Sequence, residues 1–156
     1  MSEDQHMLEA IRLATENVRT GAGGPFGCVI VKEGRVISRG TNLVTSTNDP
    51  TAHAEVVAIR RACEALKSFQ LAGCDVFTSC EPCPMCLGAL YWARPARIFF
   101  SATYKDAAAA GFDDAFIYKQ FPLKPSERSI PTSQLLGSEG TAPFKAWKDS
   151  VNKIAY

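Results

Sequence analysis

Short apolar runs alternate with amphipathic stretches along most of this chain, and this alternation restricts its fold more than any other feature of the sequence. Four runs have the length and the β-branched or aromatic content of buried strands. The first two are separated only by Glu33-Gly34, a connection that suits a β-hairpin. Strands that alternate with helices after an opening hairpin predict an α/β sandwich with a mixed sheet. The expected strands are 28–32, 35–39, 75–79 and 97–101.

Four other stretches have helical character. They are 3–19, 51–66, 84–93 and 143–153, and Pro84 suits the first position of its helix. No repeat or linker divides the chain, so we expect a single domain over residues 1–156. The first helix is expected to pack through one apolar stripe, formed by Leu8, Ile11, Ala14 or Thr15, and Val18.

The composition argues against several classes of partner. Of the 156 residues, 46% are apolar and 21% are charged, as in soluble globular proteins. The formal net charge of +1 gives no overall field that would attract a nucleic acid or an anionic membrane. No apolar run approaches the length of about 18 residues that a membrane span needs. We therefore expect neither a nucleic acid nor a membrane as partner.

The six cysteines are the next constraint. A chain of this length does not depend on disulfides, and acidic residues near its start, such as Glu3 and Asp4, do not suit a secretory leader. We expect a reducing, cytoplasmic compartment, in which clustered cysteines more often bind metal or take part in catalysis.

The glycine-rich stretch 21–27 does not have the features of a phosphate-binding loop. Phe26 stands where a dinucleotide fingerprint needs glycine, and the stretch precedes a strand instead of following one. It also lacks the Gly-Lys-Ser/Thr ending of a P-loop. We expect a helix stop and a turn, on which Phe26 can form the wall of a pocket.

A cysteine repeat offers two kinds of metal site. Cys80, Cys83 and Cys86 recur every three residues, but an iron–sulfur run of this kind needs a further cysteine at position 90, which is Leu90. Zinc bound through Cys83 and Cys86 is the alternative, and it requires a ligand from elsewhere in the chain.

The chain has two histidines. His6 lies in a polar helix start, where we expect it to face solvent. His53 opens a helix, with Glu55 two residues further on. Residues two apart on a helix point about 200° away from each other, so His53 and Glu55 reach one site only if His53 lies at a frayed first turn.

Charge and geometry favour a catalytic zinc site. Cys83 and Cys86 share a helix face, and both ligand sets lie at helix amino ends, which favour thiolates. Two thiolates and the neutral imidazole of His53 balance Zn²⁺, and three protein ligands leave a fourth position for water or hydroxide. Glu55 is then placed to accept the proton of that water and to pass it to a substrate.

Two motifs carry a family resemblance. His53-Ala54-Glu55 followed by Pro82-Cys83-Pro84-Met85-Cys86 matches the H-x-E and P-C-x-x-C signature of zinc-dependent nucleoside and nucleobase deaminases. The chain as a whole resembles bacterial guanine deaminases of the cytidine deaminase fold. The stretches that carry this closer resemblance are 41–42, 48–55, 79–89, 91–95, 110–114 and the terminal Tyr156.

The resemblance implies a fold and a reaction. The fold is a three-layer α-β-α sandwich with a mixed five-stranded sheet. The reaction is hydrolytic deamination of guanine to xanthine and ammonia by zinc-activated hydroxide. One Zn²⁺ per subunit is held by His53, Cys83 and Cys86, and Glu55 acts as proton shuttle.

The resemblance also implies the substrate contacts. Asn42 matches the position whose amide donates to and accepts from the purine edge. Phe26 and Trp92 would stack on the ring, although such aromatics also suit a core, and the backbone N–H of Ala54 would contact the ring or its oxygen. Asp114, a residue type that also suits a helix cap, would help the amino group leave as ammonia. The cysteines assigned to buried packing are Cys28, Cys63, Cys74 and Cys80.

Residues 119–156 resemble a tail that, in bacterial members of the family, packs on the active site of a partner subunit. The resemblance thus implies a homodimer with exchanged tails, in which Tyr156 closes the pocket.

Several rival functions use parts of the same sequence. The tRNA adenosine deaminases share both zinc motifs but need a basic surface, and the tail from Lys119 onward carries only six basic against three acidic residues. A deaminase of cytosine or of a triazine amine would use the same core. A structural zinc module, which is not an enzyme, would need a fourth protein ligand.

Overall fold

The computed structural model describes all 156 residues, and they form two compact units, Met1–Asp114 and Ala115–Tyr156. None of the helices combines the length and the apolar character that crossing a membrane requires.

The first unit is built on a four-stranded sheet with the order β2-β1-β3-β4. β1 (Gly27–Lys32) pairs antiparallel with both β2 (Arg35–Thr41) and β3 (Cys74–Cys80). β3 pairs parallel with β4 (Arg97–Ala102). The mixed sheet and all four strands expected from the apolar runs are confirmed, with each strand one or two residues longer than expected.

The five-stranded sheet implied by the family resemblance is wrong for this chain. After β4 the side chain of Thr103 accepts a hydrogen bond from the N–H of Asp106 and caps the helix α5 (Tyr104–Ala109). Four consecutive alanines at 107–110, which favour helix over strand, follow before Gly111 turns the chain at a φ of 94°. The segment after β4 is therefore helical, and β4 stays at the edge of the sheet.

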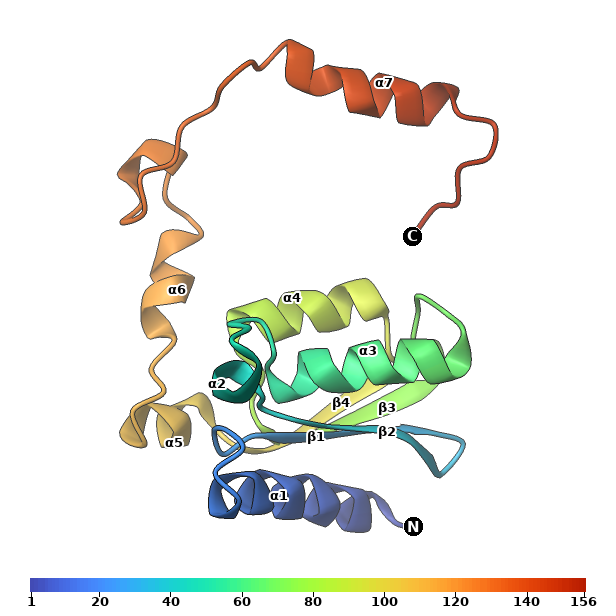
Figure 1. The fold of residues 1–156 in the computed structure, drawn as a ribbon, viewed down its shortest axis with the longest axis vertical. Helices are drawn as coiled ribbons and strands as arrows, with labels where there is room; N and C mark the ends of the chain where they lie inside the picture. The colour runs from blue at the N-terminus through green and yellow to red at the C-terminus, as the bar shows by residue number, and fades with distance from the viewer. The chain divides into compact units, whose positions relative to one another are not determined.

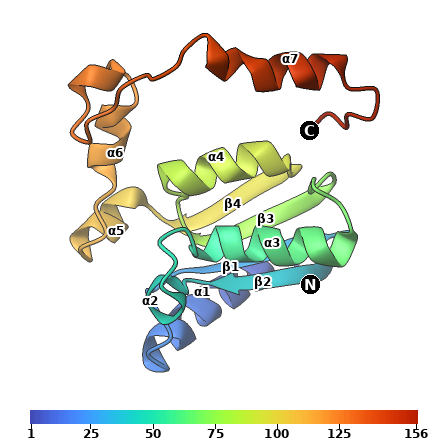
Figure 2. The ribbon, with the colours of Figure 1, turned by 45° about the horizontal axis from the view of Figure 1, so that its top comes forward.

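Helices cover both faces of the sheet. α1 (Glu3–Arg19) lies on one face, and α3 (Ala54–Leu66) and α4 (Pro84–Ala93) lie on the other (Figure 1 and Figure 2). Successive side chains of a strand point to opposite faces, so the sheet supplies two separate core clusters. One contains Val29, Val31 and Phe77 with residues of α1, and the other contains Cys28, Ile30 and Val76 with residues of α3 and α4.

The face of α1 that packs on the sheet is the expected one only at Ala14. Leu8 and Val18 are 63% and 52% exposed, whereas Ala10 and Ala14 are buried. The cause is a close approach to β1, because a Cβ added to Gly27 would lie 2.3 Å from the carbonyl oxygen of Ala10. Only small side chains fit at such a contact, so the alanine face is buried and most of the larger apolar stripe is left exposed.

His6 also departs from expectation. It lies on the packed face of α1, one turn before Ala10, and is only 2% exposed instead of facing solvent. Its ring lies 5.3 Å from that of Phe77, and neither ring nitrogen has a hydrogen-bond partner. The orientation of α1 that leaves Leu8 exposed therefore buries the ring of His6 without giving its nitrogens a hydrogen-bond partner.

The second unit has a different character. It contains α6 (Ala115–Gln120), the expected amphipathic helix as α7 (Ala142–Asp149), and two short 3-10 turns, Pro125–Glu127 and Glu139–Thr141. None of its residues is buried. Its exposed large apolar side chains are Phe116, Tyr118, Phe121, Ile130, Leu135, Leu136, Phe144, Trp147, Val151, Ile154 and Tyr156.

Candidate active site

The three expected metal ligands lie where two helices begin. His53 is the N-cap residue of α3, with φ −67° and ψ 156°, and Cys83 is the N-cap residue of α4, with φ −65° and ψ 168°. Cys86 lies in the first turn of α4 and donates its backbone N–H to the sulfur of Cys83 at 3.5 Å. His53 is therefore outside the regular helix, which is the condition under which it and Glu55 face one site.

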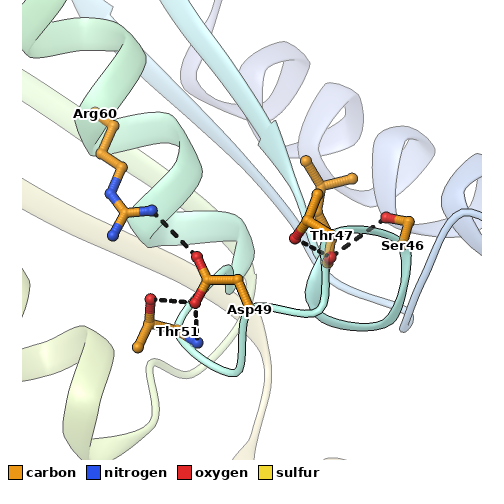
Figure 3. A network of polar contacts seen from close by, with 6 residues as sticks. Ser46, Thr47, Asp49, Thr51 and Arg60 are labelled. Atoms are coloured by element: carbon orange, nitrogen blue, oxygen red, sulfur yellow. Dashed lines mark hydrogen bonds and ion pairs between the residues drawn. The ribbon is translucent and has the colours of Figure 1, made fainter.

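The loop before His53 is ordered by Asp49 (Figure 3). Its carboxylate accepts hydrogen bonds from the N–H and the hydroxyl of Thr51, at 2.8 and 2.6 Å, and lies 3.5 Å from the guanidinium of Arg60 on α3. These bonds, from Thr51 first, lower the pKa of Asp49 because they stabilise its charged form. At the other side of the loop, the hydroxyls of Ser46 and Thr47 donate to the carbonyl of Leu43 at the start of α2 (Val44–Thr47).

The geometry of the ligand atoms fits zinc. His53 Nδ1 lies 3.5 Å from the sulfur of Cys83 and 3.5 Å from that of Cys86, and the three ligand atoms lie within 4.8 Å of one another. Bond lengths of about 2.3 Å to sulfur and about 2.0 Å to nitrogen, at a tetrahedral angle, separate nitrogen and sulfur by about 3.5 Å. The ligands His53, Cys83 and Cys86 thus suit Zn²⁺, with one corner of the tetrahedron free of protein ligands.

The cluster favours a thiolate before any metal binds. Hydrogen bonds from the thiol of Cys86 and from His53 lower the pKa of Cys83 to about 4. The same contacts with Cys83 raise the pKa of His53 and of Cys86, which both hold their protons as donors. A metal ion would therefore meet one ionised sulfur and displace two protons, that of the Cys86 thiol and the one that Nδ1 of His53 donates to Cys83.

Glu55 is buried beside this cluster. Its side chain is 6% exposed, and its Oε1 accepts a hydrogen bond of 3.2 Å from the hydroxyl of Thr78 on β3. Burial raises the pKa of Glu55, which brings it closer to the range useful for proton transfer near neutral pH. The sequence did not indicate this contact of Thr78 with Glu55. It depends on how β3 packs against α3, which the pattern of residues in the strand does not show.

Asn42, Phe26 and Ala54 lie near the same end of the sheet. The N–H of Asn42 donates to the carbonyl of Phe26 at 3.2 Å, directly after the end of β2, and Ala54 is the buried first residue of α3. The ring of Phe26 meets that of Phe112 edge to face at 5.0 Å. Phe26 lines a cavity of about 320 Å³ with Phe112, but the three metal ligands do not line that cavity, so the role of Phe26 at the site stays a prediction.

The other expected site residues are Asp114, Trp92 and Tyr156. Asp114 is half-buried, and its pKa is raised by burial and then by the negative charge of Cys83, which places it within the field of the cluster. Trp92 lies in the last turn of α4, at the opposite end of that helix from Cys86, and is exposed. Tyr156 is the last residue of the second unit. The roles assigned to these three side chains stay predictions.

The four remaining cysteines behave as expected of packing residues. All are free thiols, of which Cys28, Cys74 and Cys80 are buried and Cys63 is half-buried. Burial raises the pKa of each of these thiols, so none is activated in the way that Cys83 is.

Comparison with known proteins gives the family. Residues 1–102 match the cytidine and deoxycytidylate deaminase zinc-binding region. The chain belongs to this family. It is therefore a zinc-binding deaminase, a hydrolase that acts on C–N bonds, and not a structural zinc module.

The similarity to two relatives covers different shares of the chain. A guanine deaminase of Bacillus subtilis (strain 168) is 54% identical over 156 residues, which are 100% of both chains. Its X-ray structure matches with a TM-score of 0.98 and covers 100% of this chain and 99% of that one. A tRNA-specific adenosine deaminase of Agrobacterium fabrum is 40% identical over 102 residues, 65% of this chain and 67% of its own length.

Proposed function

We propose that this chain deaminates guanine hydrolytically to xanthine and ammonia. The observation that carries the proposal is the extent of the similarity to the Bacillus subtilis guanine deaminase, which runs through the whole chain, including the second unit. The similarity to the tRNA-specific adenosine deaminase covers only 65% of the chain. The part of the sequence after the zinc motifs therefore favours guanine over a tRNA base.

The reaction replaces the amino group of the purine with oxygen from water. His53, Cys83 and Cys86 would hold Zn²⁺, which would supply Lewis acidity and lower the pKa of a water molecule to about 7. Glu55 takes a proton from this water and delivers it to a ring nitrogen, first as base and then as acid. Its burial and its hydrogen bond from Thr78 fix the carboxylate in one place for both transfers.

Departure of ammonia completes the reaction. Water adds to the carbon that bears the amino group, and the C–N bond breaks as the new hydroxyl becomes a carbonyl. The amino nitrogen must gain a proton to leave, and the proton that the hydroxyl loses restores the acid that donates it. We assign the proton transfer to the amino nitrogen to Asp114. Burial and then the negative charge of Cys83 raise its pKa, and a raised pKa favours the protonated form that a donor needs.

The purine itself is held by residues before β1, at the end of β2 and at the start of α3. Asn42 faces the polar edge of the ring and Phe26 stacks against it, whereas a stacking role for Trp92 stays a prediction because this residue lies at the end of α4 opposite Cys86. The backbone N–H of Ala54 is one of the first donors of α3, which the helix does not use internally, so it is suited to an oxygen or nitrogen of the substrate.

We also propose that the active protein is a homodimer in which residues 119–156 pack on the active site of the partner subunit. The second unit has no buried residue and exposes many apolar side chains. α4, in which only apolar residues, Gly and Pro occur, leaves Tyr91 and Trp92 exposed, and such helices are normally buried on all sides. A tail closed over the site, with Tyr156 at its end, would exclude bulk water and complete one catalytic domain.

The thiol ligands favour a reducing, cytoplasmic location, because a Cys83–Cys86 disulfide would remove two of the three metal ligands. All six cysteines are free in the structure, as zinc binding at this site requires.

Ammonia release tests the substrate directly. Zinc-loaded protein is incubated with guanine, adenine, cytosine, cytidine, guanosine, a triazine amine and a tRNA anticodon stem. We expect release from guanine, with xanthine as the other product. Activity confined to the RNA or to cytosine or the triazine would contradict the proposal.

A further inference from the structure

Asn17, near the carboxyl end of α1, ties together the two segments that surround Asn42. It is 5% exposed, and its Nδ2 donates to the carbonyl of Gly24 at 2.9 Å and to the carbonyl of Asn42 at 2.8 Å. Both hydrogens of the amide are used. One buried side chain therefore joins the glycine-rich loop to the end of β2.

The side chain of Asn42 is fixed in one orientation by the same loop and by the start of α2. Its Oδ1 accepts hydrogen bonds from the N–H of Gly24 at 3.4 Å and from the N–H of Val44 at 3.3 Å. Because both partners are N–H donors, this atom must be the oxygen, and Nδ2 lies on the other side of the carboxamide. Both acceptor positions of the oxygen are engaged, so Asn42 can offer a substrate its donor and not, as we expected, a donor and an acceptor.

The loop packs directly against the backbone of Asn42. Gly24 takes part in both sets of bonds, because its carbonyl accepts from Asn17 and its N–H donates to Asn42. A Cβ added to Gly23 would lie 2.0 Å from the carbonyl oxygen of Asn42 and 3.1 Å from Nδ2 of Asn17. The chain thus passes in direct contact with both asparagines, which only glycine permits at this position.

We propose that Asn17 is a positioning residue that holds the carboxamide of Asn42 with its N–H turned toward the substrate. Asn17 does not touch the substrate, and it selects for purines that present a hydrogen-bond acceptor to Asn42. This inference rests on the proposed function, in which Asn42 faces the purine. A contact group that is ordered before binding loses less conformational freedom when the substrate arrives, so loss of Asn17 weakens binding more than it slows chemistry.

A double-mutant cycle on guanine deamination tests the inference. Asn17→Asp keeps the shape of the side chain but replaces the donor by a carboxylate oxygen that faces two carbonyls. We expect KM for guanine to rise by about tenfold while kcat stays within about twofold. Asn42→Ala should raise KM by at least as much, and the double variant should be no worse than Asn42→Ala alone, because Asn17 acts through Asn42.

Thr20→Val is the matched control. Thr20 lies at the end of the same helix, and its hydroxyl donates to the carbonyls of Glu16 and Asn17 without reaching the loop. We expect it to keep the wild-type KM. If Asn17→Asp fails to fold or to hold zinc, the same cycle is run with Asn17→Ser, which keeps one donor and should show a smaller rise in KM.

Two results would overturn the inference even if Asn42 contacts the substrate. One is a double variant in which the two losses multiply, which would show that Asn17 acts independently of Asn42. The other is a fall in kcat with KM unchanged. If Asn42→Ala itself leaves KM unchanged while guanine is still deaminated, the substrate contact of Asn42 is wrong and Asn17 has no contact to position, whereas the proposed reaction stands.

Discussion

The two units of the chain hold their apolar side chains in opposite ways. Met1–Asp114 buries them in two clusters, one on each face of the sheet, and the metal ligands begin two of the helices that cover one face. Ala115–Tyr156 buries no residue at all. The comparison teaches that the metal ligands lie in the unit that has a core, while the second unit has no core of its own to fix its geometry.

Glu55→Gln gives the largest expected effect, because it removes the proton carrier from the unit with the core. Turnover of guanine should fall by about 10²- to 10⁴-fold, whereas the zinc content and the midpoint of thermal unfolding should stay close to wild type. Metal analysis and ammonia release measure these quantities. A Glu55→Gln enzyme with substantial turnover would contradict the role of Glu55.

Truncation after Ala142 tests the dependence of the second unit. Loss of α7 and Tyr156 should lower turnover by about 10²-fold, because the substrate is no longer enclosed and oriented. Zinc binding and the urea midpoint of the first unit should not change. The control is Lys145→Ala in the complete chain, which removes only an exposed ion pair with Asp149. Full activity of the truncated chain would show that the tail has no role at the site.

Thr78→Val tests whether contacts inside the first unit position its catalytic carboxylate. It keeps the shape of the side chain but removes the hydroxyl that donates to Glu55, so kcat for guanine should fall by about tenfold with little change in KM. Thr78→Ser, which restores the hydroxyl, should recover most of the loss. If Thr78→Ser is as slow as Thr78→Val, packing and not the hydrogen bond is responsible.

His6→Leu has the smallest expected effect on activity and tests the core itself. It replaces a buried ring without hydrogen-bond partners by an apolar side chain, so the free energy of unfolding should rise by about 1 kcal/mol and turnover should not change. Urea unfolding monitored by circular dichroism gives the value. A less stable protein would show that the packing of His6 against Phe77 matters more than its unpaired nitrogens.

The elements that hold the site were predictable from local patterns. Pro84 at the first position of a helix, and the motifs around His53 and Cys83, depend on neighbours within a few residues, and the structure confirms the helix starts. The apolar runs likewise gave the four strands of the sheet, whereas the fifth strand came from the resemblance alone.

Contacts between distant elements were not predictable in the same way. The buried face of α1 is set by how closely Gly27 approaches Ala10, and apolar periodicity carries no information on that distance. Thr78 and Asn17 were missed because each acts on a residue more than twenty positions away, Glu55 and Asn42. Such roles appear only when strand register and helix rotation are known.

One measurement tests most directly whether a catalytic first unit is completed by the tail of another chain. Glu55→Gln chains and chains truncated after Ala142 each turn guanine over at least about 10²-fold more slowly by the predictions above, and they are unfolded together and refolded as a mixture. A mixed dimer has one site with an intact Glu55 and a tail from its partner, so the mixture should regain ammonia release from guanine. A mixture that forms mixed dimers and stays as inactive as its components would contradict the exchanged tail.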